Sequence, residues 1–249
     1  MNKRQSTIVN LVNNTTKVSV TTLAKKLNVS EVTIRKDLTL LSNYGIIIRE
    51  HGFAIKKNSV DIRNRLSINY DLKQKIAKKA AQLINFNETI IIGSGSTCAL
   101  LAEEIARTKP NVTILTHSIY IVEHASKLGN NKIILFGGEY QNDSQVMVGP
   151  LVRLNAKQYF VDKIFLGTDG FVKEIGFMGS DSLRTEAIQN MAESARHIVM
   201  LTDSSKFNKM GILVQFSPSS VSRIITDNNI SSDYLSYFKG KNIKVDIVN

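Results

Sequence analysis

The chain has 249 residues, 43% of them apolar, and this length suits one large domain or a small domain joined to a larger one. Its single cysteine excludes an internal disulfide framework, and because it has neither a run of about 20 apolar residues nor a signal-peptide pattern, we expect a cytoplasmic protein. The formal net charge of +11 is concentrated in residues 1–57, which hold ten Lys and Arg and three acids, whereas residues 58–249 hold 22 Lys and Arg and 18 acids. This imbalance favours a polyanionic partner. A solvated basic surface would have the same composition.

The N-terminal segment has the spacing of three helices. Apolar residues at helical intervals predict a helix over about residues 2–14, and after an extended piece, "KVSV", Thr21 is expected to cap a second helix. Ser30 is expected to cap a third helix, "EVTIRKDLTLLSNYG", in which Val32 can face inward and Gly45 ends the helix.

A predicted hairpin follows the third helix. The segment "IIIREHGFAIKK" predicts two short strands, Ile46–Arg49 and Phe53–Lys56, joined at Glu50-His51-Gly52. Helix, strand, helix, helix and hairpin succeed one another in the order of a winged helix-turn-helix.

The third helix carries the side chains that favour DNA binding. Its first two turns, the part of a recognition helix that enters the major groove, hold hydroxyls that can bond to phosphate or base edges and an arginine that can fork onto guanine. Asp37 is expected to pair with a nearby Arg or Lys. A helical hairpin with a solvated basic face is the alternative. The candidate DNA contacts are Ser30, Thr33, Arg35 and Lys36 in the helix and Arg49 and His51 in the wing.

Two separated stretches of this segment form one specific pattern. Arg4, Ile8 and Val12 are followed by 17 residues and then by "SEVTIRKDL", residues 30–38. This pattern resembles the DeoR family of bacterial transcription regulators, whose signature is Arg, two spaced aliphatic residues, a spacer and small-x-x-Thr-aliphatic-Arg-basic-Asp-aliphatic. Every position of the signature matches. The chain departs from the family at the wing tip, where His51-Gly52-Phe53-Ala54 replaces His-Gly-Gly-Ala.

Beyond residue 57 the sequence changes character. Residues 58–72 are mixed and polar and are predicted to form a linker. From residue 73 helical and apolar strand patterns alternate, which predicts a mostly parallel α/β sheet with buried strands. We therefore predict a DNA-binding domain at residues 1–57 and an effector-binding domain at residues 73–249.

Several predicted strands end in glycine-rich or polar residues. Because ligands bind at the carboxyl ends of strands in such sheets, these residues are expected to share one pocket. Backbone N–H groups and hydroxyls suit a phosphate, carboxylates suit sugar hydroxyls, and a lysine supplies a counter-charge, so the pocket favours a phosphorylated polyol. His117 could touch the ligand or be a satisfied loop histidine. The candidate residues are Ser94, Gly95, Ser96, Thr97, Thr116, Gly137, Gly138, Asp169, Gly170 and Lys206.

The resemblance extends to this second part of the chain. The DeoR effector domain is similar in fold to ribose-5-phosphate isomerase and CoA-transferase-type proteins, and its features can be followed at residues 94–97, Asp169-Gly170, Glu186 and residues 205–207. The resemblance implies a repressor of sugar or carbohydrate catabolism genes whose affinity for a DNA operator changes when a sugar phosphate binds. It adds Glu186 to the candidate effector-binding residues and implies no cofactor.

Two alternatives remain for the second part. An active sugar-phosphate isomerase would need a carboxylate base, for which Asp169 and Glu186 are the candidates, but Phe171-Val172 stands where the isomerase pattern has Ala-Asp. This departure favours a sensor over an enzyme. A domain that serves only for oligomerisation is the other alternative, and the polar strand ends argue against it. We expect a homodimer or homotetramer that binds repeated or palindromic half-sites.

Overall fold

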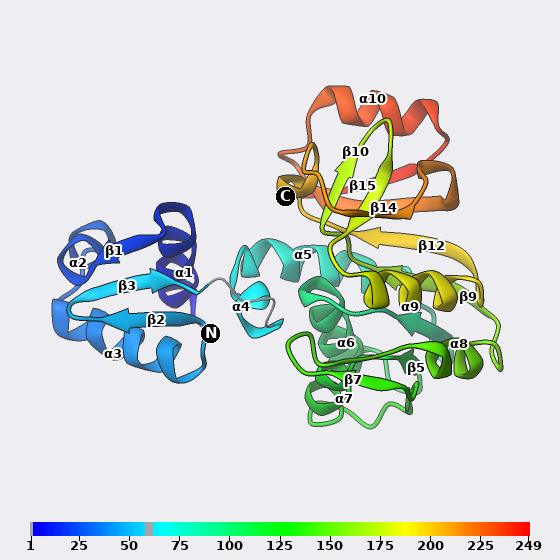
Figure 1. The fold of residues 1–249 in the computed structure, drawn as a ribbon, viewed down its shortest axis with the longest axis horizontal. Helices are drawn as coiled ribbons and strands as arrows, with labels where there is room; N and C mark the ends of the chain where they lie inside the picture. The colour runs from blue at the N-terminus through cyan, green and yellow to red at the C-terminus, as the bar shows by residue number, and fades with distance from the viewer. Residues whose placement is uncertain (1, 58–61) are drawn as a thin grey trace. The chain divides into compact units, whose positions relative to one another are not determined.

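The computed structural model describes residues 2–57 and 62–249 and divides the chain into two compact units, Met1–Asp71 and Leu72–Asn249 (Figure 1). Antiparallel strands in the order β1-β3-β2 form the sheet of the first unit, as expected of a winged helix-turn-helix. The elements of this unit are α1 (Lys3–Thr15), β1 (Lys17–Ser19), α2 (Val20–Leu27), α3 (Glu31–Asn43), β2 (Ile47–Glu50), β3 (Phe53–Lys56) and α4 (Ile62–Ser67).

Helix α4 lies in the segment that was predicted as a linker. Its Asn64 Nδ2 donates a hydrogen bond of 2.7 Å to the Lys57 carbonyl, and the N–H of Asn69 donates to Asn10 Oδ1 at 3.2 Å. Helix α4 and the residue Asn69 after it are therefore tied to the first unit. The assignment of DNA binding to residues 1–57 and of effector binding to residues 73–249 stays a prediction.

Local capping sets the ends of the helices around the helix-turn-helix. Ser30 caps α3 by accepting from the N–H of Thr33 at 3.2 Å, and Gly45, at φ +69°, ends it with the N–H of Ile46 bonded to the Leu41 carbonyl. The predicted cap of α2 was wrong by two residues. Ser19 accepts from the N–H of Thr22 at 3.0 Å and occupies that position instead of Thr21.

One apolar core holds the first unit together. Ile8, Val12, Leu23, Ile34 and Leu38 are fully buried in it, and each such side chain contributes about 1.5–3 kcal/mol by its removal from water. The expectation for Val32 was wrong, because this side chain is 63% exposed. The core therefore uses one face of α3 and leaves the opposite face to solvent.

A seven-stranded, wholly parallel sheet forms the centre of the second unit, which confirms the predicted fold class. Strands β5 and β6 follow one another on one side of β4. Strand β9 then lies on the other side of β4, and β12, β14 and β15 follow it outward. The strands, in spatial order, are β15 (Lys244–Val248), β14 (Val221–Asp227), β12 (Ala195–Leu201), β9 (Val161–Leu166), β4 (Thr89–Ile92), β5 (Thr113–Thr116) and β6 (Ile133–Leu135).

Helices connect these strands and cover the sheet (Figure 1). None in the described part of the chain combines the length and apolar character that crossing a membrane requires. The helices are α5 (Tyr70–Ala81), α6 (Ser96–Thr108), α7 (Ile119–Ala125), α8 (Pro150–Ala156), α9 (Ser182–Ala192) and α10 (Ser232–Gly240), with short 3-10 turns at η1 (Ser204–Lys206) and η2 (Pro218–Ser220).

Two small antiparallel sheets complete this unit. Strands β7 (Glu139–Gln141) and β8 (Val146–Val148) form a hairpin, and β10 (Gly170–Val172), β11 (Gly176–Gly179) and β13 (Leu213–Phe216) form a three-stranded sheet. Figure 1 shows β10 close to α10, and Phe171 of β10 contacts Tyr237 and Phe238 of α10. Aromatic side chains from β10, β11 and α10, together with the residue that follows η1, pack against one another; they are Phe171, Phe177, Phe207, Tyr234, Tyr237 and Phe238.

Candidate functional site

The exposed face of α3 combines apolar and basic side chains. Val32 and Leu40 are 63% and 46% exposed, and Arg35, Lys36 and Thr39 lie between them on the same depression of the surface. This face is opposite to the one that packs in the core. It offers donors together with methyl groups, the two kinds of contact by which a helix reads base edges in the major groove.

Arg35 is held in place by a neighbour on its own helix. Its guanidinium donates to Glu31 Oε2 at 2.9 Å, one turn earlier, while the other oxygen of Glu31 accepts from Thr21 Oγ1 at 2.7 Å. The side chains of Arg35 and Glu31 are 57% and 41% exposed. An exposed i,i+4 pair of this kind contributes only about 0.3–0.5 kcal/mol, so Arg35 can exchange Glu31 for a stronger acceptor.

Arg49 lies beside α3 and not at the tip of the wing. Its Nη1 donates to Thr39 Oγ1 at 2.7 Å, and Thr39 in turn donates to the Arg35 carbonyl at 2.8 Å. Strand β2 is thereby fastened to the exposed side of α3. A wing arginine and the helix arginine consequently belong to one connected surface.

The wing turns at His51 and Gly52. Glu50 pairs with Phe53 in the ladder, so the loop has two residues, and both have positive φ angles of 30° and 83°. This is the backbone twist that two-residue hairpins prefer. Phe53, which replaces the usual second glycine of the family, does not share that conformation; its ring lies 4.4 Å below the ammonium of Lys17.

Asp37 is buried and pairs with α1 as expected. It accepts from Arg4 Nε at 2.6 Å and from Gln5 Nε2 at 3.0 Å. The hydrogen bond and the charge of Asp37 raise the pKa of Arg4 above its ordinary value. The first and the last charged positions of the sequence signature are thus partners, and their role is to join α1 to α3.

In the second unit, the predicted effector residues follow the carboxyl ends of adjacent strands. The order along this edge is η1 after β12, then Asp169 after β9, residues 94–97 after β4, Thr116 at the end of β5 and Gly137 after β6. Strands lie about 4.8 Å apart, so the outer members are about 19 Å from each other and cannot all contact one small ligand. The centre of the edge is the junction of β4 and β9, where the strand order reverses, and this is where ligands bind in such sheets.

The loop after β4 has free backbone donors. Gly95, at φ +113°, begins α6 without a side-chain cap, and an added Cβ there would meet no atom within 4 Å. Ser96 and Thr97 form the first turn and are almost buried. Their N–H groups and the positive end of the helix dipole favour an anion at this point.

A chain of polar side chains links β9, α9 and the β7–β8 hairpin. Asp169 Oδ2 accepts from Ser180 Oγ at 2.6 Å, and Ser180 accepts from Arg184 Nη2 at 3.5 Å. Asp181 caps α9, lies 3.7 Å from Arg184 Nε and accepts from Gln141 Nε2 at 3.2 Å. Arg184 is buried although these contacts are long, so its guanidinium has capacity for a stronger acceptor.

His117 stands on the opposite side of β4 from Asp169. The residue follows β5 and is fully buried. Burial lowers the pKa of its imidazole to about 4, the bond to the Met147 carbonyl opposes this shift, and the charge of Arg184 lowers the pKa further. Its Nε2 is buried, and within the described part of the chain it has no hydrogen-bond partner. Arg184 therefore acts on residues at both sides of the loop that begins α6.

Four of the predicted effector residues have structural roles in this unit. Thr116 Oγ1 accepts from the N–H of Ser118 at 3.1 Å, and the N–H of Gly137 donates to Asn155 Oδ1 at 2.7 Å. A Cβ on Gly138 would meet the Val148 carbonyl oxygen at 2.4 Å, and one on Gly170 would meet that of Lys209 at 2.1 Å. These glycines permit close backbone contacts.

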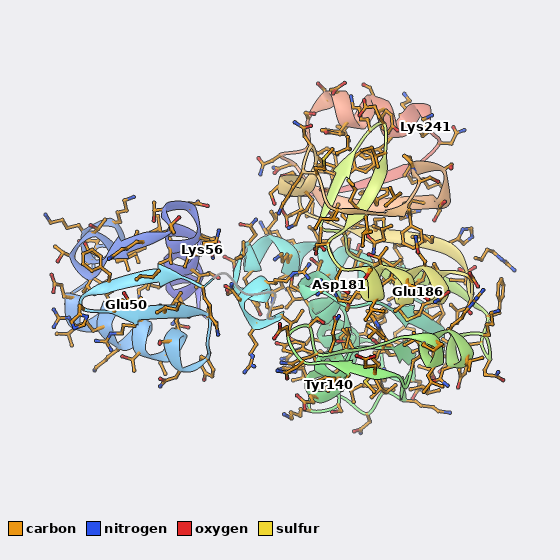
Figure 2. The ribbon with its side chains drawn as sticks, viewed as in Figure 1. Glu50, Lys56, Tyr140, Asp181, Glu186 and Lys241 are labelled. Atoms are coloured by element: carbon orange, nitrogen blue, oxygen red, sulfur yellow. The ribbon has the colours of Figure 1, made fainter. Side chains whose placement is uncertain are left out.

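The last two candidates, Lys206 and Glu186, both follow Asp169 in the sequence. Lys206 is half-buried at the end of η1. Glu186 is exposed in the second turn of α9, and Asp181 precedes the first (Figure 2). The sequence did not single out Arg184 or Gln141. Burial of a charged residue inside an amphipathic helix leaves no sequence signal of its own.

Comparison with known families agrees with both parts of the chain. The DeoR-like helix-turn-helix domain matches residues 4–60, and the DeoR C terminal sensor domain matches residues 68–228. The chain thus joins a DNA-binding module to a domain that senses an effector.

The chain is also similar to one protein of solved structure and to two transcriptional regulators. Ribose 5-phosphate isomerase A from Methanocaldococcus jannaschii is 23% identical, with 56% of this chain and 55% of that chain covered at a TM-score of 0.42. The HTH-type transcriptional regulator IolR of Bacillus subtilis is 31% identical over 88% of both chains. The lactose phosphotransferase system repressor of Streptococcus mutans is 30% identical over 90% of this chain and 91% of its own. Both relatives are transcriptional regulators, in agreement with the prediction of a regulator over an enzyme. With both family domains present in sequence order, the chain belongs to the DeoR family of transcriptional regulators.

Proposed function

We propose that this regulator represses genes of carbohydrate catabolism and that a phosphorylated sugar controls its affinity for the operator. The exposed face of α3 is the observation that carries the DNA-binding half of the proposal. The name of the lactose phosphotransferase system repressor, a relative at 30% identity, supports repression and a link to sugar uptake.

On the DNA, α3 enters the major groove with Arg35 as the principal base contact. Arg35 leaves Glu31 and donates two hydrogen bonds to a guanine, while the methyl groups of Val32 contact a thymine. Ser30, Thr33 and Lys36 bind phosphate or base edges, and His51 at the wing tip meets the backbone. Because Arg49 is bonded to Thr39, we place it on a phosphate beside α3.

In the second unit, the phosphate of the effector binds to the N–H groups of Ser96 and Thr97 at the start of α6. Asp169, Glu186 and Lys206 surround the sugar. The reversal of strand order between β4 and β9 supports this placement, because no other point of the sheet combines it with an uncapped helix start among the described elements.

The DNA-binding unit works in pairs. A single α3 contacts only a few base pairs, so two copies of the chain bind half-sites about one helical turn apart. A homodimer or homotetramer provides this arrangement, and effector binding changes the spacing of the two α3 helices.

Selection from a random duplex library tests DNA binding without knowledge of the operator. The wild-type protein should enrich one inverted or direct repeat. Arg35→Ala should weaken binding to that sequence by about 1–3 kcal/mol, which corresponds to about fivefold to 150-fold. Arg153→Ala is the matched control, because Arg153 is also an exposed arginine paired with a glutamate, Glu193, at 3.3 Å. Equal loss in both variants would contradict the role of α3.

Thermal unfolding with a panel of pentose and hexose phosphates tests the effector site. A sugar phosphate that binds the folded state must raise the melting temperature. Lys206→Ala should reduce this rise and leave DNA binding intact, and the same sugar phosphate should release the wild-type protein from the enriched DNA. A panel that gives no shift would favour a domain used for assembly alone.

A further inference from the structure

His117 is held in a single orientation by one neighbour. The N–H of Met147 donates to the His117 carbonyl at 2.8 Å, and the Nδ1 of the ring lies 2.8 Å from the Met147 carbonyl oxygen. A carbonyl oxygen only accepts hydrogen bonds, so Nδ1 carries the proton. This fixes the tautomer of the ring.

The other ring nitrogen is consequently an unprotonated acceptor. Nε2 holds a lone pair, is buried and has no hydrogen-bond partner among the residues that the structure describes. Burial and the positive charge of Arg184 both disfavour a second proton on the ring. A buried acceptor without a donor is costly, and such atoms in native proteins call for an explanation, such as a bound water or a ligand.

The position of Nε2 relates it to the proposed effector site. His117 follows β5, the strand beside β4, and Nε2 points away from β8, where Met147 holds Nδ1. Arg184 lies near enough to influence the ring and also contacts Ser180, the partner of Asp169 on the far side of β4. The start of α6 lies between these two groups. Among the described residues, the contacts of the Arg184 guanidinium are 3.5 and 3.7 Å long, so it can exchange them for a stronger acceptor on a ligand.

We propose that His117 Nε2 accepts a hydrogen bond from a hydroxyl group of the effector and so determines which sugar the regulator senses. A phosphate ester dianion has no proton to donate, so Nε2 cannot serve the phosphate. Two parts of the site then bind two parts of the effector. The start of α6 binds the phosphate, and His117 Nε2 accepts a hydrogen bond from one hydroxyl. This inference rests on the proposed sugar-phosphate function.

Two variants separate the lone pair from the fold. His117→Asn keeps a donor for the Met147 carbonyl but has no acceptor at the place of Nε2, whereas His117→Gln can place its amide oxygen there. Affinity of the full chain is measured for inorganic phosphate and for the panel of pentose and hexose phosphates. In the wild type at least one sugar phosphate should bind more tightly than inorganic phosphate. His117→Asn should weaken that sugar phosphate by about tenfold or more and leave inorganic phosphate unchanged, and His117→Gln should restore part of the loss.

A second measurement needs no substitution. Deoxy analogues of the best sugar phosphate, each lacking one hydroxyl, are titrated into the wild type. For one analogue, the wild type should lose as much affinity as the substitution His117→Asn costs for the complete sugar phosphate. The His117→Asn protein should bind this analogue and the complete sugar phosphate equally well. Equal losses for inorganic phosphate and sugar phosphate in His117→Asn, or no sensitive hydroxyl, would overturn the inference and indicate that Nε2 holds a water. If neither inorganic phosphate nor any sugar phosphate binds the wild type, the proposed effector site itself fails, and the inference falls with it.

Discussion

His117 shows how one buried side chain couples stability to pH. Its pKa falls from the ordinary 6.5 to about 4, because burial and Arg184 disfavour the charged ring. Between these pH values the unfolded chain binds a proton that the folded chain does not. The free energy of unfolding is therefore unaffected above about pH 7 and decreases as pH falls through this window, by about 3 kcal/mol in total.

Denaturant titrations from pH 7 to pH 4 test this prediction. The wild type should lose stability relative to His117→Gln, which cannot titrate, as the pH falls. His197→Gln is the matched control, because that histidine is 47% exposed and lies 4.0 Å from Asp162. A wild-type curve parallel to that of His117→Gln would show that the imidazole is not buried in its neutral form.

Gly95 is a second residue whose effect follows from its backbone. At φ +113° and ψ 164° it occupies a region that residues with a Cβ rarely adopt, although nothing would clash with the Cβ itself. Gly95→Ala should lower the free energy of unfolding by about 1–3 kcal/mol and weaken phosphate binding, because the amides at the start of α6 turn away. Gly240→Ala is the control: it lies in α10, has no positive φ and meets nothing, so it should be neutral or stabilising. Unchanged phosphate binding in Gly95→Ala would argue against this loop.

At the scale of elements, α1 and α3 are joined by a charge pair. Arg4→Ala would remove the counter-charge of the buried Asp37 carboxylate, which would keep the hydrogen bond from Gln5 Nε2. We expect a lower melting temperature and weaker DNA binding, although Arg4 is not on the exposed face of α3. Arg107→Ala, an exposed arginine at the end of α6, should change neither. Normal DNA binding by Arg4→Ala would show that α1 does not position α3.

Elements with strong local signals were predictable from the sequence. The serine that caps α3 and the glycine that ends it lie directly at the two ends of the helix. The hairpin turn at His51-Gly52 likewise depends on the residues of the turn itself. The apolar strands of the parallel sheet could also be recognised from their runs of isoleucine and valine. Each of these signals depends on interactions within a few residues.

The rest of the fold depends on partners distant in the sequence. The strands of β7–β8 and β10–β11–β13 have three or four residues each, too few for a periodic pattern. Val32 fits the helical apolar pattern, and the packing of α3 against α2 and β2 decides that it faces solvent. Arg184 and His117 acquire their properties from burial that the chain around them does not reveal. The candidate residues predicted from the sequence therefore lie along one edge of the sheet, and the buried Arg184 was not among them. Their role in binding an effector stays a prediction.

At the scale of the whole molecule, DNA and effector must influence each other equally. If a sugar phosphate weakens operator binding by some factor, the operator weakens sugar phosphate binding by the same factor, typically about 5- to 150-fold. Calorimetric titration of the best sugar phosphate, with and without saturating operator DNA, measures this factor. With Arg35→Ala the DNA should no longer change the affinity. Unequal factors in the wild type would mean that a further species, such as a different oligomer, takes part.

The separation of α3 into a buried and an exposed face also bears on how such regulators diverge. None of Val32, Arg35, Lys36, Thr39 and Leu40 belongs to the hydrophobic core, and exposed positions of this kind usually tolerate substitution within about 0.5 kcal/mol. Duplicated copies of the gene can therefore acquire new target sequences while folding and sensing stay intact. Because these exposed positions tolerate substitution, they are also suitable for engineering a regulator that binds a different DNA sequence.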